Sequence, residues 1–246
     1  MTVSMDRRTF LSLAAAPLVV GCGRVDTTAP APSASSVATA TAPIRVEVFH
    51  DLVCPWCRIG LHNLGVAIDG WSGSAVEVVL RPYLLEPETP PEGVDLRARL
   101  QRKYGTPSEQ MFARVTAAGA KAGVRFDWEK VRIMPATAKG HALLGWAPRE
   151  KQRALLDALH HAYFEEGANI GDELALASIA ARVGLDGDAV RAAVSDAARI
   201  ADVRSTAQTA SAQGIDGVPH FRFGAQRLHG AQPPEALRSA LAQSAG

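Results

Sequence analysis

Residues 44–57 read IRVEVFHDLVCPWC, a strand-like run that leads into two closely spaced cysteines. Apolar and polar residues alternate from Ile44 to Val48, and the run stays apolar into Phe49, which is typical of a strand. Cys54 and Cys57 follow with only Pro-Trp between them. The stretch therefore predicts a strand that ends just before a pair of thiols.

The residues after the cysteine pair repeat with the period of a helix. Cys57, Leu61, Leu64 and Ile68 recur at steps of four, three and four, so they share one helical stripe. Residues 76–83, VEVVLRPY, predict a second strand. A strand, a helix and a strand in this order predict parallel strands joined by a right-handed crossover.

The start of this helix explains why the two cysteines are candidate catalytic residues. Pro55 suits the first helical position, because its missing N–H would have no partner there. Cys54 then occupies the N-cap, where free backbone N–H groups and the helix dipole stabilise a thiolate. Cys57 lies one turn inside, on the apolar stripe. We expect Cys54 to attack a substrate and Cys57 to resolve the product.

The sequence gives less support to two other interpretations of the cysteine pair, a zinc site and a structural disulfide. A zinc site needs further ligands; His50, His62 or His220 are available, but the sequence has no second Cys-x-x-Cys. A structural disulfide that spans two residues adds little loop-closure entropy. We therefore expect no metal, and no cofactor other than a redox-active disulfide between Cys54 and Cys57.

The middle of the chain, about residues 93–211, is rich in Ala, Leu, Glu and Arg and is punctuated by Gly and Pro. We expect an all-helical insertion there. His160 and His161 stand at helical spacing from Glu165 and Glu166, which predicts a solvated helix face rather than a metal site.

The end of the chain returns to strand patterns. Residues 218–223 and 226–229 predict a hairpin across Gly224-Ala225, and a last helix follows from about 234 to 243. Residues 44–246 thus predict one α/β domain. Its two parts, about 44–92 and 212–246, are interrupted by the insertion at about 93–211.

The first 43 residues have the pattern of an exported protein. Arg7-Arg8 is a twin-arginine pattern, and the apolar run after it is too short to span a bilayer, so residues 1–22 predict a signal peptide. Cys22 ends a lipobox-like run and is a candidate for lipid attachment; an ordinary signal peptide cleaved nearby is the alternative. Residues 23–43, rich in Ala, Thr, Ser and Pro, predict a disordered linker. We expect a location in the periplasm or cell envelope, with a membrane contact through the lipid.

Short runs along the chain match the pattern of a known family. They are FHD at 49–51, RPYLL at 81–85, RKYG at 102–105, AYFEEG at 162–167, IGD at 170–172, GVP at 217–219 and GAQP at 230–233. Together with the CPWC motif, they make the chain similar to the DsbA family of thioredoxin-like oxidoreductases, and within it to the FrnE branch. The resemblance implies a thioredoxin-like fold interrupted by helices.

The same resemblance implies roles for individual residues. Cys54 corresponds to the attacking thiol and Cys57 to the resolving thiol. The Val218–Pro219 bond is implied to be cis and close to them, which leaves the Val218 backbone free for an extended substrate. Two further candidates come from position in the sequence alone. Trp56 is a candidate substrate contact because it stands inside the motif, and His220, directly after Pro219, is another if its side chain turns toward Cys54 rather than into the core.

One departure from related proteins bears on the chemistry. Many thioredoxin-like proteins carry an acid six residues before the first cysteine, whereas this chain has Val48. We therefore expect no buried carboxylate at that position to move the proton of Cys57.

The favoured function is an exported oxidoreductase that exchanges disulfides with protein substrates. The expected partners are proteins that carry thiols or disulfides, together with a redox partner. Nucleic acid is not among them, because 26 basic and 25 acidic residues nearly cancel. A glutathione-dependent isomerase or transferase of related fold and a chaperone-like binding module are the alternatives.

Overall fold

The computed structural model describes residues 42–105 and 107–245. The predicted signal peptide, the Cys22 lipid site and all but the last two residues of the predicted linker lie outside the described residues. Within the described ranges, no helix has the length and apolar character needed to cross a membrane.

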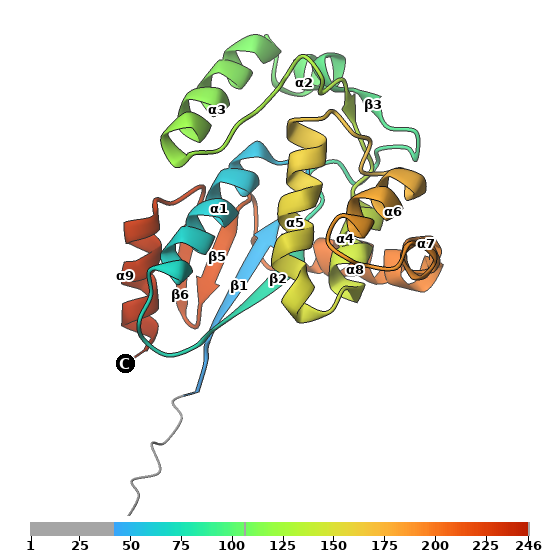
Figure 1. Ribbon diagram of the computed structural model, residues 1–246. Helices are drawn as coiled ribbons and strands as arrows, with labels where there is room; N and C mark the ends of the chain where they lie inside the picture. The colour runs from blue at the N-terminus through green and yellow to red at the C-terminus, as the bar shows by residue number, and fades with distance from the viewer. Residues whose placement is uncertain (1–41, 106, 246) are drawn as a thin grey trace, which may run out of the picture. The chain divides into compact units, whose positions relative to one another are not determined.

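A mixed sheet of four strands forms the centre of the thioredoxin-like part. Its order is β2 (Val76–Pro82), β1 (Ile44–His50), β5 (His220–Phe223) and β6 (Gln226–His229) (Figure 1). β1 and β2 are parallel, while β5 pairs antiparallel with both β1 and β6. The predicted β-α-β unit and the predicted C-terminal hairpin are both confirmed.

One face of this sheet packs against α1 (Pro55–Asp69) and α9 (Pro234–Ser244). Val46 and Val48 point to this face and join Leu64 and Leu237 in a fully buried cluster. Burial of each such side chain contributes about 1.5–3 kcal/mol before the entropy cost is subtracted. The alternation that identified the first strand therefore marks the side of the sheet that faces the core.

The insertion is helical except for one small pair of strands. It contains β3 (Val94–Asp95), α2 (Leu96–Tyr104), α3 (Ser108–Ala122), β4 (Ile133–Met134), α4 (Ala138–Trp146), α5 (Arg149–Phe164), α6 (Glu173–Ala181), α7 (Gly187–Ser195) and α8 (Ala197–Ala212). The expectation of an all-helical insertion was wrong in this detail, because β3 and β4 pair antiparallel. A two-residue strand is too short to show any alternation in the sequence.

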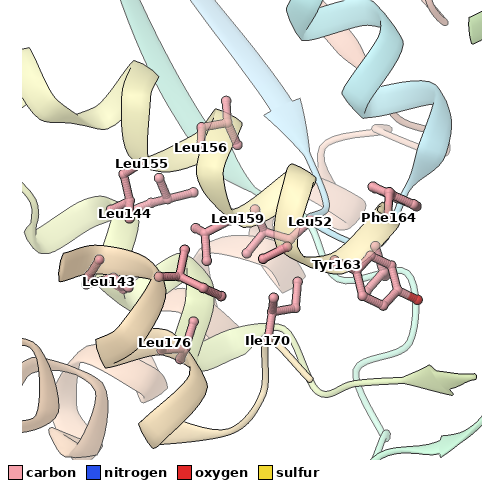
Figure 2. Close-up of a cluster of buried hydrophobic side chains, with 14 of the residues drawn as sticks. Leu52, Leu143, Leu144, Leu155, Leu156, Leu159, Tyr163, Phe164, Ile170 and Leu176 are labelled. Carbon is pink, nitrogen blue, oxygen red and sulfur yellow. The ribbon is translucent and has the colours of Figure 1, made fainter. Parts of the chain in front are cut away.

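A second hydrophobic core lies within the insertion and includes Leu52, from the turn just before the cysteine motif (Figure 2). Leu155 and Leu159 of α5, together with Leu143 of α4, are completely buried there. Leu52, from the turn between β1 and α1, is buried in the same cluster. Gly140 lets α4 approach this turn, since a Cβ at that position would lie 2.6 Å from Leu52 Cδ1. The turn that carries the cysteines is thus packed into the insertion.

Candidate active site

The N-terminus of α1 positions Cys54 as the sequence predicted. Pro55 is the first residue of the helix, and Cys54 is its N-cap with an extended backbone. The backbone N–H of Cys57 donates a hydrogen bond to Cys54 Sγ over 3.3 Å. The backbone N–H of Cys54 donates to the carbonyl of Asp51 over 3.1 Å, which fixes the preceding turn. A sulfur held in this way receives the hydrogen bond that a thiolate requires.

Cys57 differs from Cys54 in its surroundings, although both are free thiols in this structure. Cys57 has no exposed surface, whereas Cys54 keeps 4% and lines a surface cleft. Burial raises the pKa of the Cys57 thiol well above its ordinary value, and the hydrogen bond and charge of Cys54 raise it further. A substrate can therefore reach Cys54 from the cleft but cannot reach Cys57, which is the difference expected between an attacking and a resolving thiol.

The chain approaches Cys54 a second time just before β5. The Val218–Pro219 bond is cis, and the Cys54 thiol donates a hydrogen bond to the Val218 carbonyl over 3.6 Å. Within residues 42–105 and 107–245, the Val218 N–H has no hydrogen-bond partner. Gly60 lets α1 lie against this segment, because a Cβ there would be 2.9 Å from Pro219 Cγ. The residue whose carbonyl contacts Cys54 therefore also carries an unpaired backbone N–H.

A cleft of about 430 Å³ opens next to Cys54. The cysteine motif and Val218 form one wall, and α2, α3 and the segment around Trp128 form the other. Trp56 lines the cleft and also packs against the buried side chains of Ile59 and Val115. Most of the lining is apolar, and the basic residues Lys103 and Arg114 lie on it as well.

His220 does not take the orientation that would make it a substrate contact. It is 1% exposed, and its ring lies edge-on to Phe49 and to His229, with centroids 5.8 and 4.3 Å away. Burial, together with the neighbouring His229, lowers the pKa of His220. Of the two orientations that the sequence left open, the structure has the one in which the side chain enters the core.

Sequence reasoning missed a buried pair, Asp51 and His141. Asp51 is 1% exposed and its Oδ1 lies 3.4 Å from His141 Nε2 on α4. Its Oδ2 accepts the backbone N–H of Leu85 over 2.8 Å. Asp51 was visible in the FHD run, but no local pattern connected it to a histidine 90 residues away. Val48 stands six residues before Cys54, but the buried carboxylate of Asp51 stands three residues before it.

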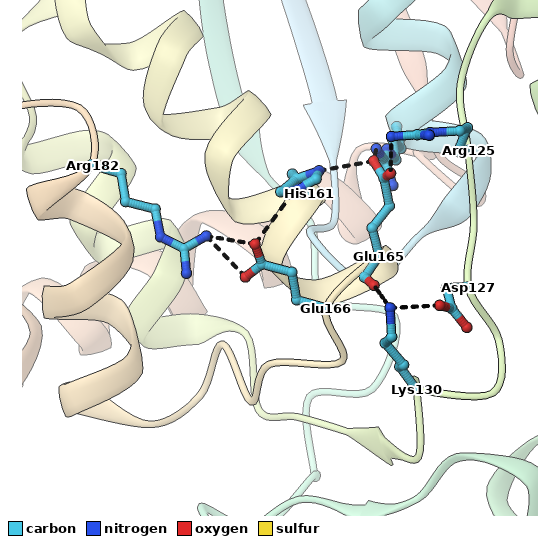
Figure 3. Close-up of polar contacts among 8 residues, drawn as sticks. Arg125, Asp127, Lys130, His161, Glu165, Glu166 and Arg182 are labelled. Carbon is cyan, nitrogen blue, oxygen red and sulfur yellow. Dashed lines mark hydrogen bonds and ion pairs between the residues drawn. The ribbon is translucent and has the colours of Figure 1, made fainter.

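The adjacent histidines of α5 lie in different environments, which corrects the expectation of one solvated face. His161 is nearly half exposed and contacts Glu165 and Glu166, and Glu166 also pairs with Arg182 (Figure 3). His160 is 3% exposed. Burial, with smaller effects of Arg58 and His141, lowers the pKa of His160 to about 3. Successive residues of a helix point about 100° apart, so one can be buried while the next is solvated.

Arg58, directly after Cys57, joins the motif to the exposed network of α5. Its guanidinium forms an ion pair with Glu165 and lies over the rings of Phe126 and Phe164. Glu165 also contacts Arg125, and Lys130 donates to its backbone carbonyl (Figure 3). In the described ranges, no three His, Cys, Asp or Glu side chains are grouped to hold a metal ion.

Comparison with known proteins identifies the architecture. A family model described as the DSBA-like thioredoxin domain matches residues 45–242. The crystal structure of a probable DsbA oxidoreductase from Streptomyces coelicolor is 32% identical, with a TM-score of 0.72, over 82% of this chain and 89% of that one. The uncharacterized protein YwbO of Bacillus subtilis (strain 168) is 27% identical over 203 residues, which are 80% of this chain and 96% of YwbO.

A more distant structure shows how widely the fold is used. The cytosolic disulfide reductase DsbM from Pseudomonas aeruginosa is 20% identical, with a TM-score of 0.59, over 81% of this chain and 98% of that one. At this level of identity, the likeness concerns the fold alone.

Proposed function

Because the chain belongs to the DSBA-like thioredoxin domain family, we propose that it is an exported thiol–disulfide oxidoreductase that acts on proteins through Cys54 and Cys57. Membership of the FrnE-like branch is consistent with the same matches. The observation that carries the proposal is the position of Cys54 Sγ. It accepts the Cys57 N–H at the helix start and lies against Val218 at the edge of the cleft.

The first step uses the exposed side of this sulfur. The Cys54 thiolate attacks one sulfur of a substrate disulfide, a mixed disulfide forms, and the other substrate sulfur leaves as a thiolate. Cys57 then attacks Cys54 Sγ, so the Cys54–Cys57 disulfide forms and the second substrate thiolate is released. The substrate disulfide is reduced and the protein dithiol is oxidised. The reverse sequence oxidises a substrate dithiol.

The neighbouring backbone favours a polypeptide as the substrate. The Val218 N–H has no partner in the described part of the chain and is available to an extended strand. The apolar cleft beside Cys54 suits a hydrophobic side chain next to the substrate cysteine. Both features argue for protein substrates over the small substrates of a glutathione-dependent isomerase or transferase.

Insulin reduction in the presence of dithiothreitol tests the proposal. We expect the wild-type protein to accelerate precipitation of the insulin chains, and Cys54→Ser to lose this activity because the attacking sulfur is gone. A wild-type protein without activity on insulin but active in glutathione conjugation would support the isomerase or transferase reading. Equal protection of an aggregating client by wild type and Cys54→Ser, without reduction, would support the chaperone-like module.

The proposed location rests on the first 43 residues. We propose that Arg7-Arg8 directs export, that Cys22 is acylated, and that residues 23–43 tether the domain to a membrane. Labelled palmitate should then be incorporated by the wild type and lost in Cys22→Ser, which should pass to the soluble fraction. Equal labelling of both proteins would contradict the lipid anchor and leave export by an ordinary signal peptide.

A further inference from the structure

Helices α2 and α3, which form part of the cleft wall opposite Cys54, are strongly basic. Residues 96–122 contain six basic side chains and one acidic side chain. Over the whole chain, by contrast, 26 basic and 25 acidic residues nearly cancel. A substrate that enters the cleft therefore meets a concentration of positive charge on the wall opposite Cys54.

Three of these basic side chains already have acidic partners. Glu86, which also lines the cleft, accepts hydrogen bonds from Arg99 and Lys103, and the bond from Lys103 Nζ is 2.6 Å long. Arg97 Nε lies 3.4 Å from Glu109 Oε1. The charge that Lys103 brings to the cleft is therefore compensated inside the protein.

Arg114 of α3 also lines the cleft, and it has no such partner. Its side chain is exposed, and no hydrogen bond or ion pair engages the guanidinium within residues 42–105 and 107–245. A guanidinium presents a fork of N–H donors that matches the two oxygens of a carboxylate. Arg114 is therefore available to bind an acidic side chain of a substrate.

Asp216 is the matching acid on the other wall, which Cys54 and Val218 form. It stands two residues before Val218 and is exposed. In the described part of the chain, its carboxylate takes part in no hydrogen bond or ion pair. The cleft thus has an unpaired positive charge on one wall and an unpaired negative charge on the other.

The geometry of an extended polypeptide relates these two charges to positions in a substrate. Successive side chains of a strand point to opposite faces. The substrate cysteine has to point to the wall of Cys54 to react with it, so its two neighbours point to the wall of Arg114. The residues two positions away point back to the wall that carries Asp216.

We propose that Arg114 and Asp216 determine which polypeptides react at Cys54, by favouring an acidic residue next to the substrate cysteine and a basic residue two positions from it. The inference rests on the proposed function and adds a substrate class to it. The two side chains position the polypeptide through ion pairs and take no part in the exchange of sulfur bonds. A substrate with the opposite charges brings like charges together on both walls, which weakens its binding.

Two peptide disulfides of equal composition test this pattern. Each is a self-quenched dimer of a fluorescent peptide, with the core Lys-Asp-Cys-Asp-Lys in one and Asp-Lys-Cys-Lys-Asp in the other. Because the net charge is the same, long-range attraction to the basic wall is equal for both peptides. Because each core is symmetric, the direction of the bound strand does not matter. Dividing the rate with the reduced full-length protein by the rate with dithiothreitol removes the intrinsic difference in disulfide reactivity.

The ratio of the two corrected rates is the readout. We expect the wild type to react about tenfold faster with the first peptide, as the sum of several weak ion pairs at the protein surface. Arg114→Gln should lower this ratio to about threefold, whereas Arg114→Lys should keep most of it. Exchange of both charges, in Arg114→Glu with Asp216→Lys, should make the second peptide the faster one. A loss of folded protein lowers both rates together and leaves the ratio unchanged.

Arg102→Gln is the matched control. Arg102 lies on α2, is exposed and has no ion pair in the described ranges, but it does not line the cleft. The substitution removes the same charge from the same pair of helices, so the ratio should stay at about the wild-type value. An equal loss in Arg102→Gln and Arg114→Gln would assign the preference to the general field of the basic helices and overturn the proposal.

Three other results would also overturn it while leaving the proposed function intact. They are equal corrected rates of the wild type with the two peptides, an unaltered ratio in Arg114→Gln, and a charge exchange that does not invert the preference. Reaction of the wild type with neither peptide, or a reaction that persists in Cys54→Ser, would instead reject the proposed function on which the inference rests.

Discussion

The two cysteines of the motif lie in opposite environments: Cys54 lines a surface cleft, and Cys57 is buried in the interior. On the cleft side, Cys54 lines the cleft together with Trp56 and donates to the carbonyl of Val218, whose N–H is unpaired in the described part of the chain. On the interior side, Cys57 has no exposed surface, and Leu52 of the preceding turn is packed into the core of the insertion. One turn of helix separates the two sulfurs. The difference shows that burial, rather than sequence distance, distinguishes the thiol that we propose attacks from the thiol that we propose resolves.

The largest expected effect on activity comes from replacing each of the two cysteines by serine in a separate variant. Cys54→Ser should reduce the rate of insulin reduction by at least about 10³-fold, because no nucleophile remains. Cys57→Ser should keep the first step and trap the substrate as a mixed disulfide. Mass spectrometry under non-reducing conditions measures the adduct. A stable adduct on Cys54→Ser, with none on Cys57→Ser, would reverse the two assignments.

Removing packing from the interior side should cost stability. Leu52→Ala should lower the free energy of unfolding by about 2–5 kcal/mol, because it opens a cavity between the motif and the insertion. Urea denaturation measures the change. Trp56→Ala is the matched substitution on the cleft side, and we expect it to raise KM for a peptide disulfide with a smaller loss of stability. Equal destabilisation by both variants would mean that the two sides are equally packed.

The buried histidine of α5 should make the protein sensitive to acid. The pKa of His160 is lowered to about 3 in the folded state, so the unfolded chain binds a proton that the folded chain does not. The full contribution of neutral His160 to the free energy of unfolding is present above about pH 6.5, the pKa of a histidine in the unfolded chain. Below that pH the free energy of unfolding falls by roughly 1.4 kcal/mol per pH unit, until the pH reaches the pKa of His160 in the folded protein.

Denaturation at a series of pH values measures this slope. His160→Gln should remove the contribution of one proton, while the slope should stay in His161→Gln, whose side chain is 47% exposed. An unchanged slope in His160→Gln would show that this histidine becomes protonated without unfolding.

The smallest expected effect is a loss of stability at alkaline pH, caused by the buried thiol of Cys57. Its folded pKa is raised, so the reduced protein should be stable up to the pKa of an unfolded thiol, about 8.5, and lose about 1.4 kcal/mol per pH unit above it. Cys57→Ser and the oxidised protein should lack this part of the slope. If the stability of the reduced wild type and of Cys57→Ser fell equally above about pH 8.5, the raised pKa of the buried Cys57 thiol would be contradicted.

Local patterns in the sequence predicted the parts of the fold that are built locally. The alternation from Ile44, the stripe of Cys57 and Leu64, and the turn at Gly224-Ala225 each lie within one element or one hairpin. The N-cap position of Cys54 was predictable for the same reason, since Pro55 fixes where the helix begins.

Features that depend on distant contacts could not be predicted in this way. The pairing of Asp51 with His141 joins the turn after β1 to helix α4, which no periodicity in the sequence connects, and it is visible only in the three-dimensional structure. The burial of His160 depends on which elements surround α5, because the helix is polar at several neighbouring positions. His220 entered the core for a similar reason: its place opposite Phe49 follows from sheet register.

Because the chain is synthesised from its N-terminus, Cys54 is made well before Val218, the residue that it contacts. The helix cap at Cys54 needs only residues close by, whereas the contact of Cys54 with Val218 spans 164 residues. At ribosomal rates of about 5–20 residues per second, the thiol pair is synthesised roughly ten to thirty seconds before its partner segment. During this interval the nascent chain carries the Cys54 thiol without the Val218 backbone, which we propose receives a substrate. Completion of the site is therefore one of the last events of biosynthesis.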